Sequence, residues 1–297
     1  MPIAIHPHFD TVTNTVSYVV IDRASARAAI IDPVLDFEAK AATIATTIAD
    51  GLLATVEQQG ATLDYVLETH AHADHLTAAH YIRARTGARI VIGAHIRNVQ
   101  SIFTPVFAAE PIETGKVFDM LVEEGDTLAL GETDIRVMHT PGHTPACLTY
   151  LIDDAAFVGD TLFMPDYGTA RADFPGGDAA TLFRSIRKIL ALPPETRIFV
   201  GHDYLPKGRS DFRWETTVAE QRAANVHVHD GVSEAEFVAM REARDATLDA
   251  PTLILPSLQV NIQGGKLPSP DAQGRAFLRL PINALGKHSP LPAELFE

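Results

Sequence analysis

The chain has 297 residues, of which 46% are hydrophobic and 21% are charged, and its formal net charge at pH 7 is −14. This length allows one large domain or two smaller ones, and the composition is typical of a soluble globular protein. Binding to a phosphate backbone needs clustered Lys and Arg, and the acidic chain shows no such cluster, so a nucleic-acid partner is not expected.

The cellular compartment is suggested by what the chain lacks. Its single cysteine, Cys147, allows no intramolecular disulfide, which suits a reducing compartment. The first six residues do not combine a charged stretch with an apolar one, so no secretory signal is predicted. No run of about 18 apolar residues occurs, so neither a transmembrane helix nor a membrane partner is expected. We therefore expect a cytoplasmic protein.

The apolar periodicity predicts alternating strands and helices. In the first half we expect strands over 16–21, 28–31, 64–69 and 88–92, helices over 38–59 and 76–86, and a short helix with a loop over 96–115. In the second half we expect strands over 128–130, 134–138, 147–152, 155–158 and 197–200, and helices over 178–191, 214–224 and 233–247. The rest, from residue 250, is rich in Pro and Gly and predicts a mostly extended tail. The pattern indicates an α/β protein.

One segment concentrates potential metal ligands. The residues from Thr69 to His75 read T-H-A-H-A-D-H and directly follow the apolar run 65–67. Its candidate ligands are His70, His72, Asp74 and His75. Imidazole and carboxylate are ligands that Zn and Fe(II) favour, and a strand that ends in them delivers them to the sheet edge where α/β proteins bind ligands. The plain alternative is a surface loop that is simply rich in His and Asp.

Three later apolar runs also end in a ligand type. The run 135–138 leads to His143, the run 155–158 leads to Asp160, and the run 198–200 leads to His202. A glycine immediately precedes each of these three residues, and glycine permits a tight backbone at a close approach. Four strand-like runs that each supply a ligand indicate a single metal centre.

These elements resemble the metallo-β-lactamase superfamily in both identity and order. They are the H-x-H-x-D-H stretch, Pro141-Gly142-His143-Thr144, Gly159-Asp160 and Gly201-His202. The resemblance implies an αβ/βα sandwich, in which two mixed β-sheets flanked by helices hold the metal at one edge. It implies a metallo-β-lactamase-like domain over residues 1–250 and a C-terminal extension over 251–297 that packs on the same domain.

Within the superfamily the chain resembles the persulfide dioxygenases, in particular the bacterial form often encoded beside rhodaneses. The segments that carry this resemblance are 170–174, 255–261 and His202-Asp203-Tyr204, where glyoxalase II usually has His-Glu-Tyr. The resemblance implies oxidation of glutathione persulfide, or a related low-molecular-weight persulfide, by O2 to sulfite and free thiol in sulfide detoxification. A rhodanese partner and a homodimer are left open.

The resemblance also assigns the ligands. A single Fe(II) would be held by His70, His143 and Asp160, a facial triad that leaves three positions open for the persulfide and O2. The other four candidates, His72, Asp74, His75 and His202, would orient ligands and bound water.

Two alternatives remain. All seven ligands of a two-zinc hydrolase of glyoxalase II type, which cleaves thiolesters, are present: one zinc would be held by His70, His72 and His143, the other by Asp74, His75 and His202, with Asp160 between them. The second alternative is a non-catalytic persulfide-binding module.

For substrate recognition the resemblance places Arg171, Tyr204 and Arg222 around a glutathione moiety, since the planar guanidinium suits carboxylates. The plain alternatives are an ion pair of Arg171 with Asp173, packing of Tyr204 beside the metal, and a solvated helix face for Arg222. The stretch 205–215 is longer than in the mitochondrial type, which leaves the thiol carrier open.

Overall fold

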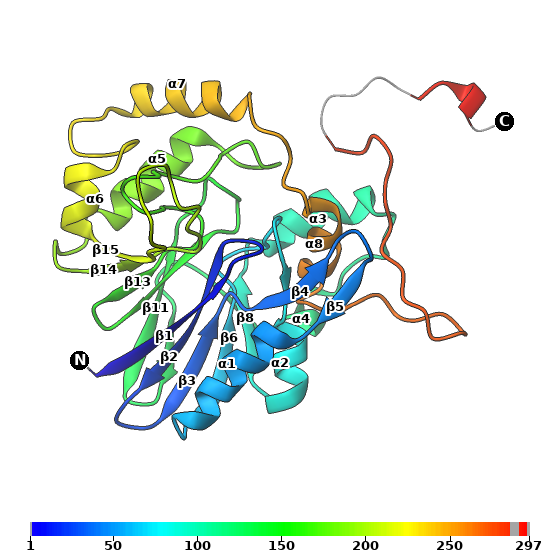
Figure 1. Cartoon of the computed structure of the whole chain (residues 1–297), viewed down its shortest axis with the longest axis horizontal. Coiled ribbons are helices and arrows are strands. Elements are labelled where there is room, and N and C mark those ends of the chain that lie inside the picture. The colour runs from blue at the N-terminus through cyan, green and yellow to red at the C-terminus, as the bar shows by residue number, and fades with distance from the viewer. Residues whose placement is uncertain (1, 286–290, 296–297) are drawn as a thin grey trace.

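Two six-stranded β-sheets lie face to face in the computed structural model, which describes residues 2–285 and 291–295 (Figure 1). The first sheet contains, in spatial order, β1 (Ile3–Asp10), β2 (Thr15–Asp22), β3 (Arg27–Ile31), β6 (Thr62–Leu67), β8 (Arg89–Gly93) and β9 (Met120–Val122). The second contains β10 (Thr127–Leu130), β11 (Thr133–His139), β12 (Leu148–Ile152), β13 (Ala155–Phe157), β14 (Arg197–Phe199) and β15 (Glu215–Thr217). A small third sheet joins β5 (Thr43–Ala45), β4 (Val34–Glu38) and β7 (Leu76–Thr77).

Both large sheets are mixed. In the first, β1, β2 and β3 are antiparallel neighbours, whereas β3, β6, β8 and β9 run parallel. In the second, only the β13–β14 pair is parallel. Parallel neighbours place their C-terminal ends at the same edge of the sheet, so the residues that follow β3 and β6 meet there.

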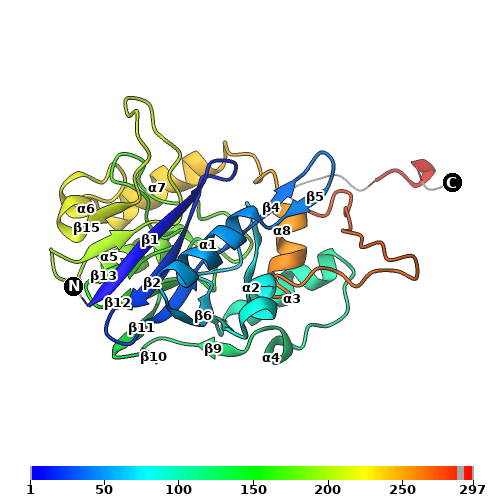
Figure 2. The same cartoon turned by 60° about the horizontal axis from the view of Figure 1, so that its bottom comes forward.

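The helices cover the outer faces of the two sheets. They are α1 (Thr47–Gln58), α2 (Ala79–Thr86), α3 (Ile96–Val106), α4 (Thr114–Val117), α5 (Ala179–Ile189), α6 (Val218–Ala224), α7 (Glu234–Asp245) and α8 (Ile254–Asn261), with a 3-10 turn η1 (Ala293–Leu295). Figures 1 and 2 show α5, α6 and α7 on one side and α1, α2, α3 and α8 on the other. None of the described helices is both long enough and apolar enough to span a bilayer.

Three apolar clusters fill the spaces between these layers. The middle cluster joins the two sheets, and within it the rings of Tyr18 and Phe157 meet edge to face at 5.2 Å. A second cluster lies between the first sheet and α1, α2, α3 and α8, and a third between the second sheet and α5 and α7. An apolar layer on each face of each sheet gives the αβ/βα sandwich, and the predicted fold class is confirmed.

The helix predicted over 38–59 is wrong in its first part. Glu38 ends β4, its carboxylate accepts hydrogen bonds from the backbone of Lys40 and Ala41, and Ala42 has a φ of 52°. This turn sends the chain back as β5, and the helix begins only at Thr47. The β-branched residues around 43–47 favour a strand there.

Two more predicted helices begin later than expected. Leu76 and Thr77 pair with β4, so α2 starts at Ala79 rather than at residue 76. Residues 215–217 pair with β14, and a capping box formed by Thr217 and Glu220 then starts α6.

The tail predicted to be mostly extended contains a helix, α8. Pro256 occupies its first turn, where the missing N–H costs no helical hydrogen bond. Leu258, Val260 and Ile262 are buried against the first sheet's outer cluster. Beyond α8 the chain runs away from the sheets (Figure 2), and residues 286–290 and 296–297 of the predicted extension lie outside the described residues.

Candidate metal centre and the cavity beside it

The first ligand loop, residues 70–75, begins where β6 ends and is anchored by Asp32 at the end of neighbouring β3. One oxygen of the Asp32 carboxylate accepts from the backbone N–H of Thr69 at 2.7 Å, and the other accepts from its hydroxyl at 2.8 Å. The hydroxyl proton is therefore committed to Asp32. Since Thr69 Oγ1 also lies 2.9 Å from Nδ1 of His70, that nitrogen must donate, which leaves Nε2 of His70 free.

His143 and Asp160 each follow a glycine, and at both glycine positions a side chain would clash with neighbouring atoms. Gly142 has a φ of 136°, and a Cβ there would lie 2.3 Å from the backbone of Leu182. Gly159 has a φ of 48°, and a Cβ there would lie 2.4 Å from Thr69 Oγ1. These approaches place His143 and Asp160 close to the first loop, as glycine at both positions permits.

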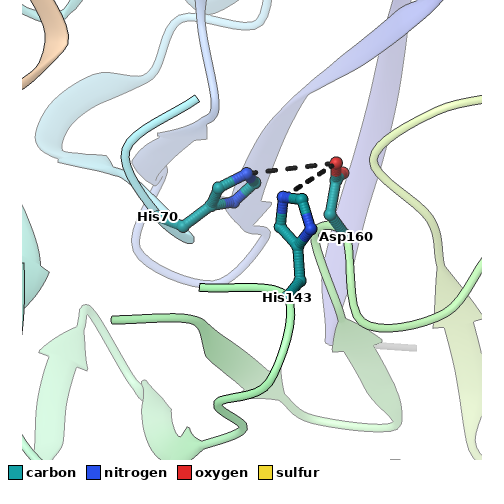
Figure 3. Close-up of side chains that lie close together, drawn as sticks. All are labelled: His70, His143 and Asp160. Atoms are coloured by element: carbon teal, nitrogen blue, oxygen red, sulfur yellow. Dashed lines mark ion pairs between the residues drawn. The ribbon is translucent and has the colours of Figure 1, made fainter. Parts of the chain in front are cut away.

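His70, His143 and Asp160 come together as one group (Figure 3). Oδ2 of Asp160 lies 3.7 Å from Nε2 of His143 and 4.0 Å from Nε2 of His70. All three residues are buried, and their ligand atoms lie within 4.8 Å of one another. The spacing suits three ligands arranged around one ion.

A second group lies next to the first and contacts its Asp160 through His202. His72, Asp74 and His202 also bring ligand atoms within 4.8 Å of one another. Nε2 of His202 lies 3.3 Å from Asp74 Oδ2 and 3.3 Å from Oδ1 of Asp160. One oxygen of the Asp160 carboxylate therefore faces the first group, and the other oxygen faces the second.

The hydrogen bonds of the histidines prepare them as ligands. Nδ1 of His143 donates to the carbonyl of Arg171 at 2.8 Å, Nδ1 of His75 donates to the carbonyl of Leu76 at 3.1 Å, and Nδ1 of His202 lies 3.2 Å from the carbonyl of Asn14. Donation from one ring nitrogen leaves the other as a lone-pair donor for a metal.

Several buried atoms remain without a hydrogen-bond partner in the described part of the chain. They include Nε2 of His70, His75 and His202, Oδ2 of Asp74 and Oδ1 of Asp160. Buried polar atoms are normally satisfied, so this convergence is what a bound cation would resolve. The donor set fits iron or zinc equally well.

His72 differs from the other histidines. Its Nε2 lies 3.1 Å from Asp32 and 3.5 Å from Glu68, both buried, so Nδ1 is the nitrogen left for a metal. Burial alone lowers the pKa of His72, but the two carboxylates raise that pKa well above its ordinary value. By contrast, burial lowers the pKa of His70 well below its usual range and that of His75 to about 4.

A cavity of about 550 Å³ opens beside Asp74, His143 and Asp160. Its wall includes the aromatic residues Phe163, Tyr167 and Tyr204 and the basic residues Arg171, Arg241 and Arg244. Among the ligands of the first group, the cavity thus reaches His143 and Asp160 directly. A small molecule held there would approach the first metal-ligand group.

Two of the three predicted substrate residues line this cavity. The Tyr204 ring lies parallel to the His202 ring, 5.5 Å away, and is 37% exposed. Arg171 forms an ion pair with Asp173, which was the alternative to a role in substrate binding. It also donates to the carbonyl of Asp249 at 2.6 Å. Arg171 nevertheless lines the cavity, and its carbonyl accepts the hydrogen bond from Nδ1 of His143.

The third predicted substrate residue, Arg222, is not among the residues that line the cavity, and its guanidinium pairs with Asp230 at 3.0 Å. Arg241 and Arg244, from α7, line the cavity instead, and the sequence prediction missed both. It also missed Asp32 and Glu68. Asp32 could have been found, because it follows a strand parallel to the one that carries the ligand loop.

Comparison with known proteins begins with a family model for the metallo-beta-lactamase superfamily, which matches residues 10–202. The chain is 53% identical over 289 residues to a probable metallo-hydrolase of Burkholderia pseudomallei, covering 93% of this chain and 98% of that protein. It is 54% identical over 278 residues to a beta-lactamase hydrolase-like protein of Xylella fastidiosa, and the match covers 93% of this chain but only 64% of that longer protein.

Two other curated proteins carry more specific names. Glyoxylase B2 of Dictyostelium discoideum is 42% identical over 288 residues, covering 95% of this chain and 97% of that protein. The mitochondrial persulfide dioxygenase ETHE1 of Homo sapiens is 32% identical over 206 residues, 68% of this chain and 69% of that protein. The crystal structure of ETHE1 from Myxococcus xanthus superposes with a TM-score of 0.72 at 31% identity, covering 89% of this chain and 100% of that one.

Proposed function

Because the chain belongs to the metallo-β-lactamase superfamily, we propose that it is an iron-dependent persulfide dioxygenase. The observation that carries this proposal is the group of His70, His143 and Asp160, of which His143 and Asp160 line the cavity. Two imidazoles and one carboxylate with open positions are the ligand set of mononuclear non-haem iron oxygenases. The similarity to the human and Myxococcus ETHE1 proteins supports the same reading.

In this proposal His70, His143 and Asp160 hold one Fe(II) per chain. When bound, iron supplies the electron exchange with O2 that zinc, which has no redox chemistry, cannot supply. Thr69 and the carbonyl of Arg171 keep the two imidazoles in the tautomer that ligates through Nε2. Nε2 of His202 lies 3.3 Å from both Asp74 Oδ2 and Asp160 Oδ1, so His202 would support the Asp160 carboxylate from its other side.

We propose that the cavity binds glutathione persulfide or a related low-molecular-weight persulfide. The exposed residue Arg244 would offer positive charge on its wall for a carboxylate of such a carrier, whereas Arg171 and Arg241 are already paired with Asp173 and Asp245. Tyr204 offers a flat ring and a hydroxyl beside the ligands. The persulfide sulfur would lie at the part of the cavity that is lined by His143 and Asp160.

A zinc-dependent thiolester hydrolase of glyoxalase II type is the alternative, and a specific observation favours it. The second group of His72, Asp74 and His202 meets the same distance limit as the first, and Asp160 faces both. The similarity to Dictyostelium glyoxylase B2 is also greater in identity and coverage than that to human ETHE1. In a two-metal site these extra ligands would hold the second zinc, and bound zinc would supply a hydroxide for thiolester hydrolysis.

A comparison of two substrates on one iron-containing preparation separates these functions. We expect turnover of glutathione persulfide and close to background cleavage of S-lactoylglutathione. The His143→Ala variant, which lacks a ligand of the first group, serves as the inactive control. Rapid thiolester cleavage without persulfide turnover, retained after loading with zinc, would reject the dioxygenase and establish the hydrolase.

A further inference from the structure

The side chain of Asn261, the last residue of α8, reaches the metal-ligand loop. Its Nδ2 donates to the backbone carbonyls of His72 at 2.7 Å and His75 at 2.8 Å, and its Oδ1 accepts from the backbone N–H of Thr77 at 2.8 Å. Asn261 is only 2% exposed. Both amide protons and the amide oxygen are therefore used on one short stretch of backbone 184 to 189 residues away in sequence.

The two carbonyls that Asn261 holds lie on either side of Ala73 and Asp74. These are the two residues of the loop that line the cavity, and Asp74 also faces His202. With the carbonyls of His72 and His75 fixed by one planar amide, the peptide between them has little freedom to shift. Asp74 is therefore carried on a stretch of backbone that Asn261 holds at both ends.

The amide is itself held in place, because α8 is fixed by packing against the outer cluster of the first sheet and by contacts just beyond its C-terminal end. Leu258 and Val260 are fully buried, and the side chain of Gln100 donates to the carbonyl of Ile262 at 2.9 Å. Just beyond the helix, Gly265 has a φ of 84°, and a Cβ there would lie 2.9 Å from the carbonyl of Thr77. A helix packed this closely positions its last side chain within a narrow range.

We propose that Asn261 is a positioning residue for the metal centre: through His72 and His75 it fixes the ligand loop against His70, His143 and Asp160. The C-terminal segment is then part of the metal site's support. This role holds for iron and for zinc alike. The role of Asn261 is tested by metal binding, whereas the dioxygenase proposal is tested by substrate turnover, so either can fail without the other.

The test is the Asn261→Asp substitution, with Co(II) as a spectroscopic metal. Aspartate has the same shape and keeps the acceptor for Thr77, but it places an oxygen without a proton against two carbonyls. Loss of such outer support typically lowers metal affinity about 10–100-fold. We expect that loss in a competition titration with a chelator, together with a shift of the Co(II) visible bands that report ligand geometry.

Ser257→Ala is the matched control, because Ser257 is equally buried one turn earlier on α8 and its hydroxyl has no partner among the described residues. We expect wild-type Co(II) affinity and spectrum in this variant. If Asn261→Asp does not fold, Asn261→Ser, which retains a donor, replaces it and should show a smaller change in the same direction. Wild-type affinity and spectrum in the folded Asn261 variant, or an equal loss in Ser257→Ala, would overturn the proposal.

Discussion

Nε2 of His202 lies 3.3 Å from Oδ1 of Asp160, on the side of the carboxylate that faces away from His70 and His143. Asp160 thus belongs to one potential ligand group and contacts a second through His202, so the number of bound metals decides what His202 does. In a one-iron site His202 supports the carboxylate, whereas in a two-zinc site it is a ligand.

This relationship gives a prediction for metal content. His143→Ala should lose the iron, because it removes one of three protein ligands, while His202→Ala should keep most of it. Elemental analysis of protein purified without added metal gives the count, with one iron per chain expected in the wild type. Two metals per wild-type chain, or equal loss in the two variants, would contradict the assignment.

Substrate recognition is tested with two exposed arginines. Arg244 lines the cavity, whereas Arg222 does not and pairs with Asp230. We expect Arg244→Ala to raise KM for glutathione persulfide about tenfold with little change in kcat, the lower end of what a charged hydrogen bond contributes, because the residue is exposed.

Arg222→Ala, which removes the same charge outside the cavity lining, should leave KM within about twofold of the wild type, as an exposed ion pair contributes little. A larger rise in KM for Arg222→Ala than for Arg244→Ala would instead place Arg222 in the substrate site.

The support of His70 is tested by Thr69→Val, which keeps the shape of the side chain but removes the hydroxyl between His70 and Asp32. Iron affinity should fall about 10–100-fold, as is usual when an outer partner of a ligating histidine is lost. Thr149→Val is the control, since its buried hydroxyl contacts Thr140 rather than a histidine. Unchanged affinity in Thr69→Val would mean that His70 needs no such partner.

Much of this site could be predicted from the sequence because its ligands follow short apolar strands at glycine-marked turns. Gly142 and Gly159 signal close backbone approaches, and the structure shows what they approach. The residues that line the substrate cavity were harder to predict from the sequence. The cap at Ser233 predicts α7, but no local pattern says that Arg244 on this helix, rather than Arg222 on α6, lines the cavity.

The helix α8 escaped prediction for a related reason. It is eight residues long and contains Pro256, so its local preference for helix is weak, and packing of Leu258 and Val260 stabilises it. Helices of this kind depend on tertiary contacts that a single sequence does not reveal. Because α8 was not predicted, the hydrogen bonds of Asn261 to the ligand loop could not be predicted either.

The pH dependence of stability should include a contribution from His227. Burial, with Arg241 and Arg244 nearby, lowers its pKa to about 4, against the partly opposing charge of Asp245. Between pH 6.5 and about 4 the unfolded chain therefore binds a proton that the folded chain does not, so the free energy of unfolding falls as the pH falls through this range.

His227→Asn keeps an acceptor for the backbone N–H of Thr169, which bonds to Nδ1 of His227 at 3.1 Å, but it cannot titrate. Denaturant unfolding of the metal-free proteins at pH 7 and pH 5 should show a smaller loss of stability in the variant. An equal loss in both proteins would exclude His227 as a source of the pH dependence.

The most direct test of the proposed dioxygenase activity is the stoichiometry of O2 uptake and sulfite release with glutathione persulfide. Both oxygen atoms of O2 end on sulfur in this reaction, so an oxygen electrode combined with sulfite determination should give one O2 consumed per sulfite formed. The ratio should hold for the iron-containing protein, and both signals should vanish in His143→Ala. Absence of O2 uptake by iron-replete protein, with S-lactoylglutathione cleaved rapidly under anaerobic conditions, would contradict the proposed function.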